Sequence, residues 1–301
     1  MATLHNNVVP ASGADATIGV FGGGYGGSYL NTIDYITIAS AGNATDFGDL
    51  LVARFRVSAC ADATRGVFAG GRASGGIEVN TIDYITIASA GNASDFGDLL
   101  GSRTFVGACA DATRGVFMGG GVPLSPYRTN AIEYITIQTT GNATDFGDLL
   151  AARYDGAACA DATRGMFGGG YDSGGASNAI EYITIQTTGN ASDFGDLSVA
   201  RNTIGACADA TRGVFGGGNG VNVIDYVTIQ TTGNATDFGD LTVSRFGVAA
   251  CADATRGVFG GGYGGSYLNT IDYITIQTTG NASDFGDLSV ARRTLGACAG
   301  G

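Results

Sequence analysis

Six cysteines are the residues of this chain best placed to do chemistry, because all of them occur in one repeated phrase. Five copies read close to "ACADATRG", recur about every 48 residues and are followed by a sixth, shortened copy; the cysteines are Cys60, Cys109, Cys159, Cys207, Cys251 and Cys298. Equivalent positions in a repeat array lie a whole repeat apart, whereas a disulfide requires Cα atoms within about 7 Å. We therefore expect free thiols, buried as small apolar side chains.

Catalytic and metal chemistry has few candidate residues in the repeats. The only histidine is His5, near the N-terminus, so histidine-based triads and histidine-bound metals require that segment to fold back. A carboxylate pair could perform acid–base chemistry, but the aspartates recur identically in every repeat, as turn residues do. Since an active site normally breaks such symmetry, we predict that the protein is not an enzyme and holds no metal or cofactor.

Three short motifs match the residue types of known functional motifs but lack the spacing or the neighbouring structure that the function requires. The run 22–27 matches G-x-G-x-x-G, but a strand rather than a helix follows it, so no phosphate site is expected. The run 43–49 is rich in Asn and Asp but lacks the spacing of a calcium loop. Asn43-Ala44-Thr45 and its equivalents match a glycosylation pattern; we interpret these asparagines as forming local hydrogen bonds in a turn.

Two sets of arginines recur. Arg65 and its equivalents follow an aspartate by three positions, and we expect them to form ion pairs within that turn. Arg54 and its equivalents precede the cysteine phrase. Two interpretations of this second set remain open: pairing with carboxylates of the Asp49 type, or a ring of cations that faces a ligand.

The elements that must position these residues are four short strands per repeat. In the second copy they are predicted at 55–61 (strand A), 65–70 (B), 82–88 (C) and 94–99 (D), joined by turns rich in Asp, Asn and Gly. Strand C is apolar on both faces, as expected for a sheet packed between two neighbours, and the small residues of strand A suit an innermost position. Six such units predict an all-β fold, a six-bladed β-propeller of four-stranded antiparallel blades.

The two ends of the chain complement each other. The first copy begins at strand B, and an additional strand A follows the sixth copy, so we expect the C-terminal strand to complete blade 1 and close the ring. The predicted organisation is a tail at 1–12 and one propeller at 13–301. Its blades are 17–50 with 293–299, then 54–99, 103–149, 153–197, 201–241 and 245–288.

The repeat resembles the kelch repeat of galactose-oxidase-like propellers. The resemblance rests on an arginine before strand A, the pair Gly70-Gly71, Tyr84 in strand C, and Phe96 and Leu99 in strand D. It implies a propeller that binds partners through one face. The chain departs from the pattern in having no tryptophan. The near-identity of its copies also resembles tandem-repeat proteins encoded by bacteriophages.

Charge excludes two classes of partner. The formal net charge is −12 and all fifteen basic residues are arginine, without a basic cluster that could neutralise phosphates. We therefore expect no nucleic-acid partner and no binding to anionic membranes, and no segment approaches the roughly 20 apolar residues of a membrane span. No signal peptide is visible. The expectation is a soluble monomer, cytoplasmic or associated with a virion.

Differences between the copies indicate a binding face. The A–B and C–D turns are almost constant, whereas the B–C connections and the residues that enter strand A vary, and antiparallel strands place these two kinds of connection at the same end of a sheet. The predicted binding residues are Tyr25, Tyr29, Arg72, Glu78, Tyr127, Arg128, Tyr154, Tyr171, Asp172, Asn219, Asn222, Tyr263 and Tyr267. Tyrosine and arginine are favoured where proteins bind partners.

The function predicted on this basis is a non-catalytic interaction module that recognises a protein or a glycan through its variable loops. Two alternatives remain open: a structural component of a phage particle, and a symmetric scaffold without a ligand. Variation in solvent-exposed loops that carry no function would produce the same differences between copies.

Overall fold

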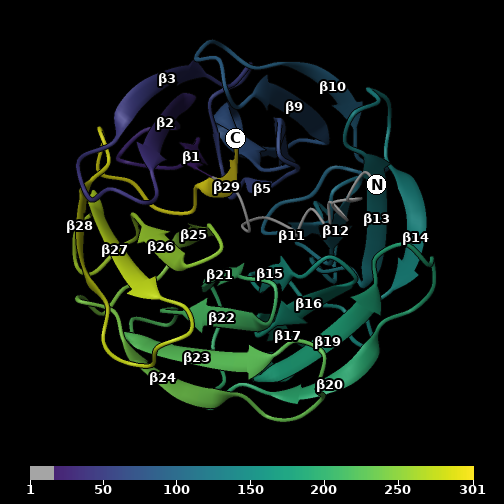
Figure 1. The fold of residues 1–301 in the computed structure, drawn as a ribbon. Helices are drawn as coiled ribbons and strands as arrows, with labels where there is room; N and C mark the ends of the chain where they lie inside the picture. Colours follow the sequence, from purple (N-terminus) through teal and green to yellow (C-terminus); the bar gives the residue numbers. More distant parts are fainter. Residues whose placement is uncertain (1–16) are drawn as a thin grey trace, which may run out of the picture.

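The fold is all-β, as predicted. The computed structural model describes residues 17–301, so the predicted tail at 1–12 and His5 lie outside the described residues. The described chain forms six four-stranded antiparallel sheets and two smaller ones, with a single 3₁₀ turn at Ser74–Gly76. The six larger sheets follow one another in chain order around a common centre (Figure 1).

Each larger sheet has the strand order A-B-C-D from the centre outward. Sheet 1 comprises β29 (Gly296–Gly300), β1 (Ile18–Gly22), β2 (Thr32–Thr37) and β3 (Thr45–Asp49). Sheet 2 comprises β5 (Ser58–Ala61), β6 (Arg65–Ala69), β9 (Thr81–Thr86) and β10 (Ser94–Asp98). Sheet 3 comprises β11 (Gly107–Ala110), β12 (Arg114–Met118), β13 (Ala131–Thr136) and β14 (Thr144–Asp148).

The remaining three sheets repeat this order. Sheet 4 comprises β15 (Ala157–Ala160), β16 (Arg164–Gly168), β19 (Ala179–Thr184) and β20 (Ser192–Asp196). Sheet 5 comprises β21 (Gly205–Ala208), β22 (Arg212–Gly216), β23 (Val223–Thr228) and β24 (Thr236–Asp240). Sheet 6 comprises β25 (Ala249–Ala252), β26 (Arg256–Gly260), β27 (Thr270–Thr275) and β28 (Ser283–Asp287).

The two small sheets lie in the connections between strands of the larger ones, which the sequence predicted to be loops except at Phe55, assigned there to strand A. One contains β4 (Arg54–Phe55), β7 (Arg72–Ala73) and β8 (Ile77–Glu78), and the other contains β17 (Tyr171–Asp172) and β18 (Gly175–Ala176). Strand A of sheet 2 begins at Ser58 rather than at the predicted position 55. The reason is that Arg56 has a φ of 61°, a left-handed conformation that interrupts an extended strand.

The C-terminal strand belongs to the first sheet. β29 pairs antiparallel with β1, with Cys298 opposite Val20 and Gly296 opposite Gly22. The most distant segments of the described chain are thus neighbours, as the extra copy of strand A predicted.

Six apolar clusters fill the spaces between neighbouring sheets. In the cluster between sheets 2 and 3, Phe96 and Leu99 of sheet 2 pack against Phe117 and Ile135 of sheet 3. Equivalent clusters lie between sheets 1 and 2, 3 and 4, 4 and 5, and 5 and 6, and another joins sheet 6 to sheet 1. Each large sheet is therefore covered on both faces, which explains why strand C is apolar on both sides.

Candidate binding face and central cavity

The variable connections lie at the end of the sheets where strands B and D finish, which we call the loop face. Seven of the predicted residues there form two groups of tyrosine rings. Tyr25 packs against Tyr29 and Tyr267 with ring centroids 5.6 and 5.7 Å apart, and Tyr263 extends this group through Tyr267. Tyr154 lies between Tyr127 and Tyr171, with centroids 5.7 and 5.6 Å away.

These tyrosines are less exposed than the sequence predicted. Only Tyr171, at 40 % exposure, is an exposed ring, and the other six are half-buried. The cause is edge-to-face and tilted packing of the rings on one another and on Phe55 and Phe246.

The other predicted residues serve mainly to organise the loops. Arg72 lies 3.6 Å from Glu78, and Glu78 also accepts a hydrogen bond from the Tyr127 hydroxyl at 3.5 Å. The Asp172 carboxylate accepts from the N–H of Gly174, and the exposed Asn219 accepts from the N–H of Asn202. Arg128 and Asn222 are half-buried in the same connections. The structure therefore places all thirteen residues on the loop face, but it does not gather them into one site.

The centre of the loop face is a closed ring of six backbone hydrogen bonds. Each sheet contributes the residue two positions after its strand-entering arginine, and each N–H donates to the carbonyl of the preceding member over 2.7 to 3.2 Å. The members, which we call the mouth residues, are Arg56, Phe105, Asp155, Thr203, Gly247 and Thr294. All six have φ between 52° and 70°. Five non-glycine residues in this conformation represent strain that the ring of hydrogen bonds must offset.

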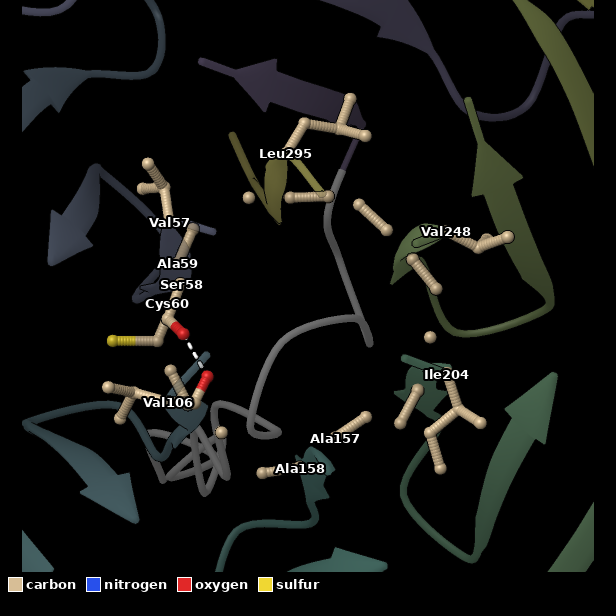
Figure 2. Close-up of a pocket in the computed structure, with 18 of the residues that line it drawn as sticks. Val57, Ser58, Ala59, Cys60, Val106, Ala157, Ala158, Ile204, Val248 and Leu295 are labelled. Atoms are coloured by element: carbon tan, nitrogen blue, oxygen red, sulfur yellow. Dashed lines mark hydrogen bonds between the residues drawn. The ribbon is translucent and has the colours of Figure 1, made fainter. Parts of the chain in front are cut away.

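A cavity of about 130 Å³ opens inside this ring. Its wall is formed by the six A strands, including Ala59, Cys60 and Ala158 (Figure 2). The mouth residues line its opening. Most of the wall is glycine, alanine and cysteine, which confirms that the small residues of strand A occupy the innermost position.

Two mouth residues have ionisable side chains, Arg56 and Asp155, and these break the sixfold symmetry. Asp155 is 7 % exposed, and its Oδ2 accepts from the Asn202 side chain at 3.4 Å, while its Oδ1 has no hydrogen-bond partner within residues 17–301. Burial raises the pKa of Asp155 to about 8, against the opposing charge of Arg56. The Arg56 guanidinium lies 4.0 Å above the Phe105 ring and donates to the Tyr127 hydroxyl, and its buried Nε has no partner in the part of the chain that the structure describes.

The sequence prediction missed Arg56 and Asp155. It considered the variable residue directly after each strand-entering arginine, such as Tyr154, whereas the residue one position further lines the cavity. The sequence did mark this position as variable. The second residue after the strand-entering arginine is Arg, Phe, Asp, Thr, Gly and Thr in the six copies.

The loop face also carries apolar residues that the prediction missed. The D–A connections expose seven large apolar side chains by 38 to 61 %, which we call the apolar belt: Leu51, Val52, Leu100, Leu150, Val199, Val243 and Val290. Ile77 and Leu124, in B–C connections, are exposed by 63 and 78 %. Repetition distributes these side chains around the whole face.

The strand-entering arginines form buried ion pairs, but not with the carboxylates of the Asp49 type. Arg54 pairs with Asp83 of strand C at 3.1 Å, and Arg292 pairs with Asp34 at 2.9 Å. The other four pairs are Arg103–Glu133, Arg153–Glu181, Arg201–Asp225 and Arg245–Asp272. Every side chain in these pairs is at most 4 % exposed, so the alternative of a cationic ring facing a ligand is wrong.

The second set of arginines does not form the predicted ion pairs. Arg65 Nη1 donates to the carbonyl of Ile137 in the next sheet at 2.9 Å, and its guanidinium lies 4.3 Å above the Tyr84 ring. The Asp62 carboxylate instead accepts the backbone N–H groups of Thr64 and Arg65, both at 2.8 Å. The aspartate closes the turn, and the arginine joins two sheets.

The asparagines of the glycosylation pattern also join sheets rather than forming local turn bonds. Asn92 Oδ1 accepts from the N–H of Asp49 in the preceding sheet at 3.1 Å. The same bond recurs around the molecule, and the last one runs from Asp287 to Asn43 at 3.1 Å.

The six cysteines are free and buried, as predicted. Burial raises the pKa of the Cys60 thiol well above its ordinary value and that of Cys298 to about 12, so both remain protonated. Within residues 17–301, no group of His, Cys, Asp and Glu has the arrangement of a metal site. In the same part of the chain, no helix has the length and apolar character needed to cross a membrane.

Comparison with known proteins adds no assignment: no protein-family model and no curated protein matches this chain.

Proposed function

We propose that the six large sheets are the blades of a kelch-like, six-bladed β-propeller whose loop face binds another protein without catalysis. Three contacts support the closed ring: the pairing of β29 with β1, the apolar cluster between sheets 6 and 1, and the hydrogen-bond ring of the mouth residues.

The binding proposal rests on one observation. The residues that differ between the six copies and the exposed large apolar side chains lie at the same end of the sheets, the loop face. Leu100 and Leu150 are exposed by 60 and 61 % there. Large apolar patches on protein surfaces mark sites of interaction.

A protein partner fits this face better than a glycan. Sugars stack on free faces of aromatic rings, whereas most tyrosines here pack against one another and are half-buried. The apolar belt instead provides side chains that a protein interface can desolvate.

The test is a screen of protein and glycan arrays with the full chain, followed by measurement of affinity for any protein that binds. The loop-face variant combines Leu100→Ser, Leu150→Ser and Tyr171→Ser, three exposed positions on neighbouring connections. The matched control combines Thr139→Ala, Thr187→Ala and Thr231→Ala, exposed positions at the opposite end of the sheets.

We expect specific binding to a protein, lowered at least ~10-fold in the loop-face variant and unchanged in the control, with thermal unfolding of both close to that of the parent. Binding that survives in the loop-face variant, binding to glycans alone, or no partner at all would each overturn the proposal. The last result would favour a structural component or a scaffold.

A further inference from the structure

Neighbouring sheets are joined by polar side chains at the end opposite the loop face, where the A–B and C–D turns lie; we call this end the turn face. Arg114 of sheet 3 donates to the carbonyl of Ile185 in sheet 4 at 2.9 Å. Gln186 of sheet 4 donates in return to the side chains of Asp111 and Thr113. The same bonds join sheets 2 and 3, 4 and 5, and 5 and 6, so these four junctions share one set of side-chain bonds.

The junction between sheets 1 and 2 lacks this set. Ile18 stands where the other five sheets have the arginine, and Ala88 stands where sheets 3 to 6 have the glutamine, so neither side chain has a donor. Strands A and B of sheet 1 also come from the two ends of the described chain and have no turn between them. The two sheets keep the recurring asparagine bond and a backbone bond from the Gly301 N–H to the carbonyl of Ala63 at 2.7 Å.

The junction between sheets 6 and 1 lacks the glutamine alone. Ala39 stands at its position, so Asp253 of sheet 6 receives no hydrogen bond from that side chain. The arginine bond is present, from Arg256 to the carbonyl of Ile38 at 3.2 Å. Within residues 17–301, sheet 1 is therefore the sheet with the fewest of these side-chain bonds to its neighbours.

At the loop face, by contrast, sheet 1 is held on both sides. Tyr25, in its B–C connection, packs against Phe55 ahead of sheet 2 and against Tyr267 of sheet 6, with ring centroids 5.5 and 5.7 Å apart. The Tyr25 N–H also donates to the carbonyl of Arg293 at 3.0 Å. One end of sheet 1 is thus fixed, and the other end is joined by fewer bonds than in the remaining sheets.

We propose that sheet 1 is a gate whose turn-face end separates from sheet 2 while the other sheets stay closed, with the aromatic contacts at the loop face as the pivot. A local opening breaks only the interactions at its boundary, so it occurs where these are fewest. The opening uncovers the apolar cluster between sheets 1 and 2, which includes Ile18, Ile87 and Cys298. This inference goes beyond the proposed protein binding and does not depend on it.

The cysteines provide an internal probe of the opening, because one of them lies at each junction. Cys298 faces Gly66 between sheets 1 and 2, and Cys109 faces Gly165 between sheets 3 and 4. Both thiols are free and buried, and burial raises the pKa of each. A buried thiol reacts only while its junction is open, so its rate of alkylation follows the population of the open state.

The first test treats the full chain with iodoacetamide under native conditions and follows each cysteine by mass spectrometry. The peptides produced by cleavage after arginine differ in sequence, so the six thiols are measured separately. We expect Cys298 to react at least ~10-fold faster than Cys109, with Cys251 of the junction between sheets 6 and 1 in between. Equal rates for Cys298 and Cys109 would overturn the inference.

The second test uses Ile18→Arg, which supplies the missing arginine. The new side chain should reach the carbonyl of Ile87 as Arg114 reaches its acceptor in sheet 4. We expect alkylation of Cys298 to slow at least ~5-fold and that of Cys109 to stay unchanged. Because residue 18 lies on β1, this result separates opening of the junction from fraying of β29 alone.

The matched control transfers the residues of sheet 1 to a closed junction. Arg114→Ile combined with Gln186→Ala removes the side-chain bonds between sheets 3 and 4. Alkylation of Cys109 should rise at least ~10-fold, while that of Cys298 stays unchanged. Thermal unfolding of each variant confirms that it is folded.

Alkylation of Cys298 that Ile18→Arg does not slow, or alkylation of Cys109 that the transfer does not accelerate, would contradict the gate. Neither result affects the protein binding proposed for the loop face, because the array screen and the loop-face variant measure that function separately.

Discussion

Among single residues, Asp83 shows how one substitution between copies of the repeat leaves an oxygen of a buried carboxylate without a hydrogen bond. Its Oδ2 forms the ion pair with Arg54 and accepts from the N–H of Leu51, both at 3.1 Å, whereas its Oδ1 has no partner among the described residues. In the connection from sheet 4 to sheet 5 the position of Leu51 is held by Ser198, whose hydroxyl donates to Asp225 Oδ1 at 2.6 Å. Burial also raises the pKa of Asp83 above its ordinary value.

We predict that Leu51→Ser stabilises the protein. The new hydroxyl should reach Asp83 Oδ1 as Ser198 reaches Asp225, which raises the free energy of unfolding by about 1 kcal/mol. Little apolar burial is lost, because Leu51 is 51 % exposed. Urea unfolding measures the change.

The matched control for this prediction is Leu100→Ser. There the carboxylate is Glu133, and both of its oxygens already have partners, the N–H of Leu100 at 2.9 Å and Arg103 at 2.6 Å. The control should change the free energy of unfolding by no more than about 0.5 kcal/mol. Equal effects of the two substitutions would contradict the role of the free oxygen.

Among elements, the contact of strand A with the next sheet explains why two residues, the cysteine of strand A and a glycine of strand B, are the same in all copies of the repeat. A Cβ built on Gly115 of strand B would lie 2.9 Å from Cys60 Sγ of the preceding sheet. The equivalent distances around the molecule are 2.7 to 3.0 Å, and they include Cys251 against Gly19 and Cys298 against Gly66. The cysteine and the glycine are therefore complementary in volume.

We predict that Gly115→Ala lowers the free energy of unfolding by about 1–3 kcal/mol, because the added methyl group overpacks this contact. In a Cys60→Ala background the same substitution should cost at least ~1 kcal/mol less, since the sulfur atom is gone. Chemical unfolding of the four proteins of this double-mutant cycle measures the coupling.

Gly91→Ala controls for the general effect of replacing glycine in this chain, since no atom of residues 17–301 outside its chain neighbours lies within 4 Å of its Cβ position. It should be neutral or slightly stabilising. A Gly115→Ala cost that does not change in the Cys60→Ala background would show that the sulfur contact is not the cause.

For the whole molecule, the decisive contact is between the two ends of the described chain. β29 provides the A strand of sheet 1, and Leu295 belongs to the cluster between sheets 6 and 1. Removal of this segment leaves strand β1 with an open edge and uncovers apolar surface on two sheets.

We predict that deletion of residues 293–301 unfolds or aggregates the protein. Circular dichroism and size-exclusion chromatography should show loss of the cooperative unfolding transition or formation of large particles. A synthetic peptide of residues 293–301, added during refolding, should restore the soluble folded form if the lost strand is the cause. A truncated chain that is soluble and fully folded would refute this account of the contact.

The sequence alone determined the all-β class, the four strands of each unit, the free buried cysteines and the additional strand A. These features follow from local patterns: alternation of apolar residues, turn residues at constant offsets, and a phrase repeated at equal spacing. It also placed the variable residues at one end of the sheets, because antiparallel strands alternate in direction.

Only the tertiary structure decided which groups meet. The strand-entering arginines were expected beside carboxylates of the Asp49 type. Instead, the buried Arg54 side chain reaches past strand B, where it donates to the carbonyl of Phe68, and pairs with Asp83 of strand C. Arg65 and Asn92 were assigned to their own turns, whereas both bind the adjacent sheet. The meeting of Arg56 and Asp155 at the mouth of the cavity was missed because these residues lie far apart in the chain and share an environment only when the A strands converge. Distances along a sequence do not determine packing between sheets, which depends on side-chain volume and on direction in three dimensions.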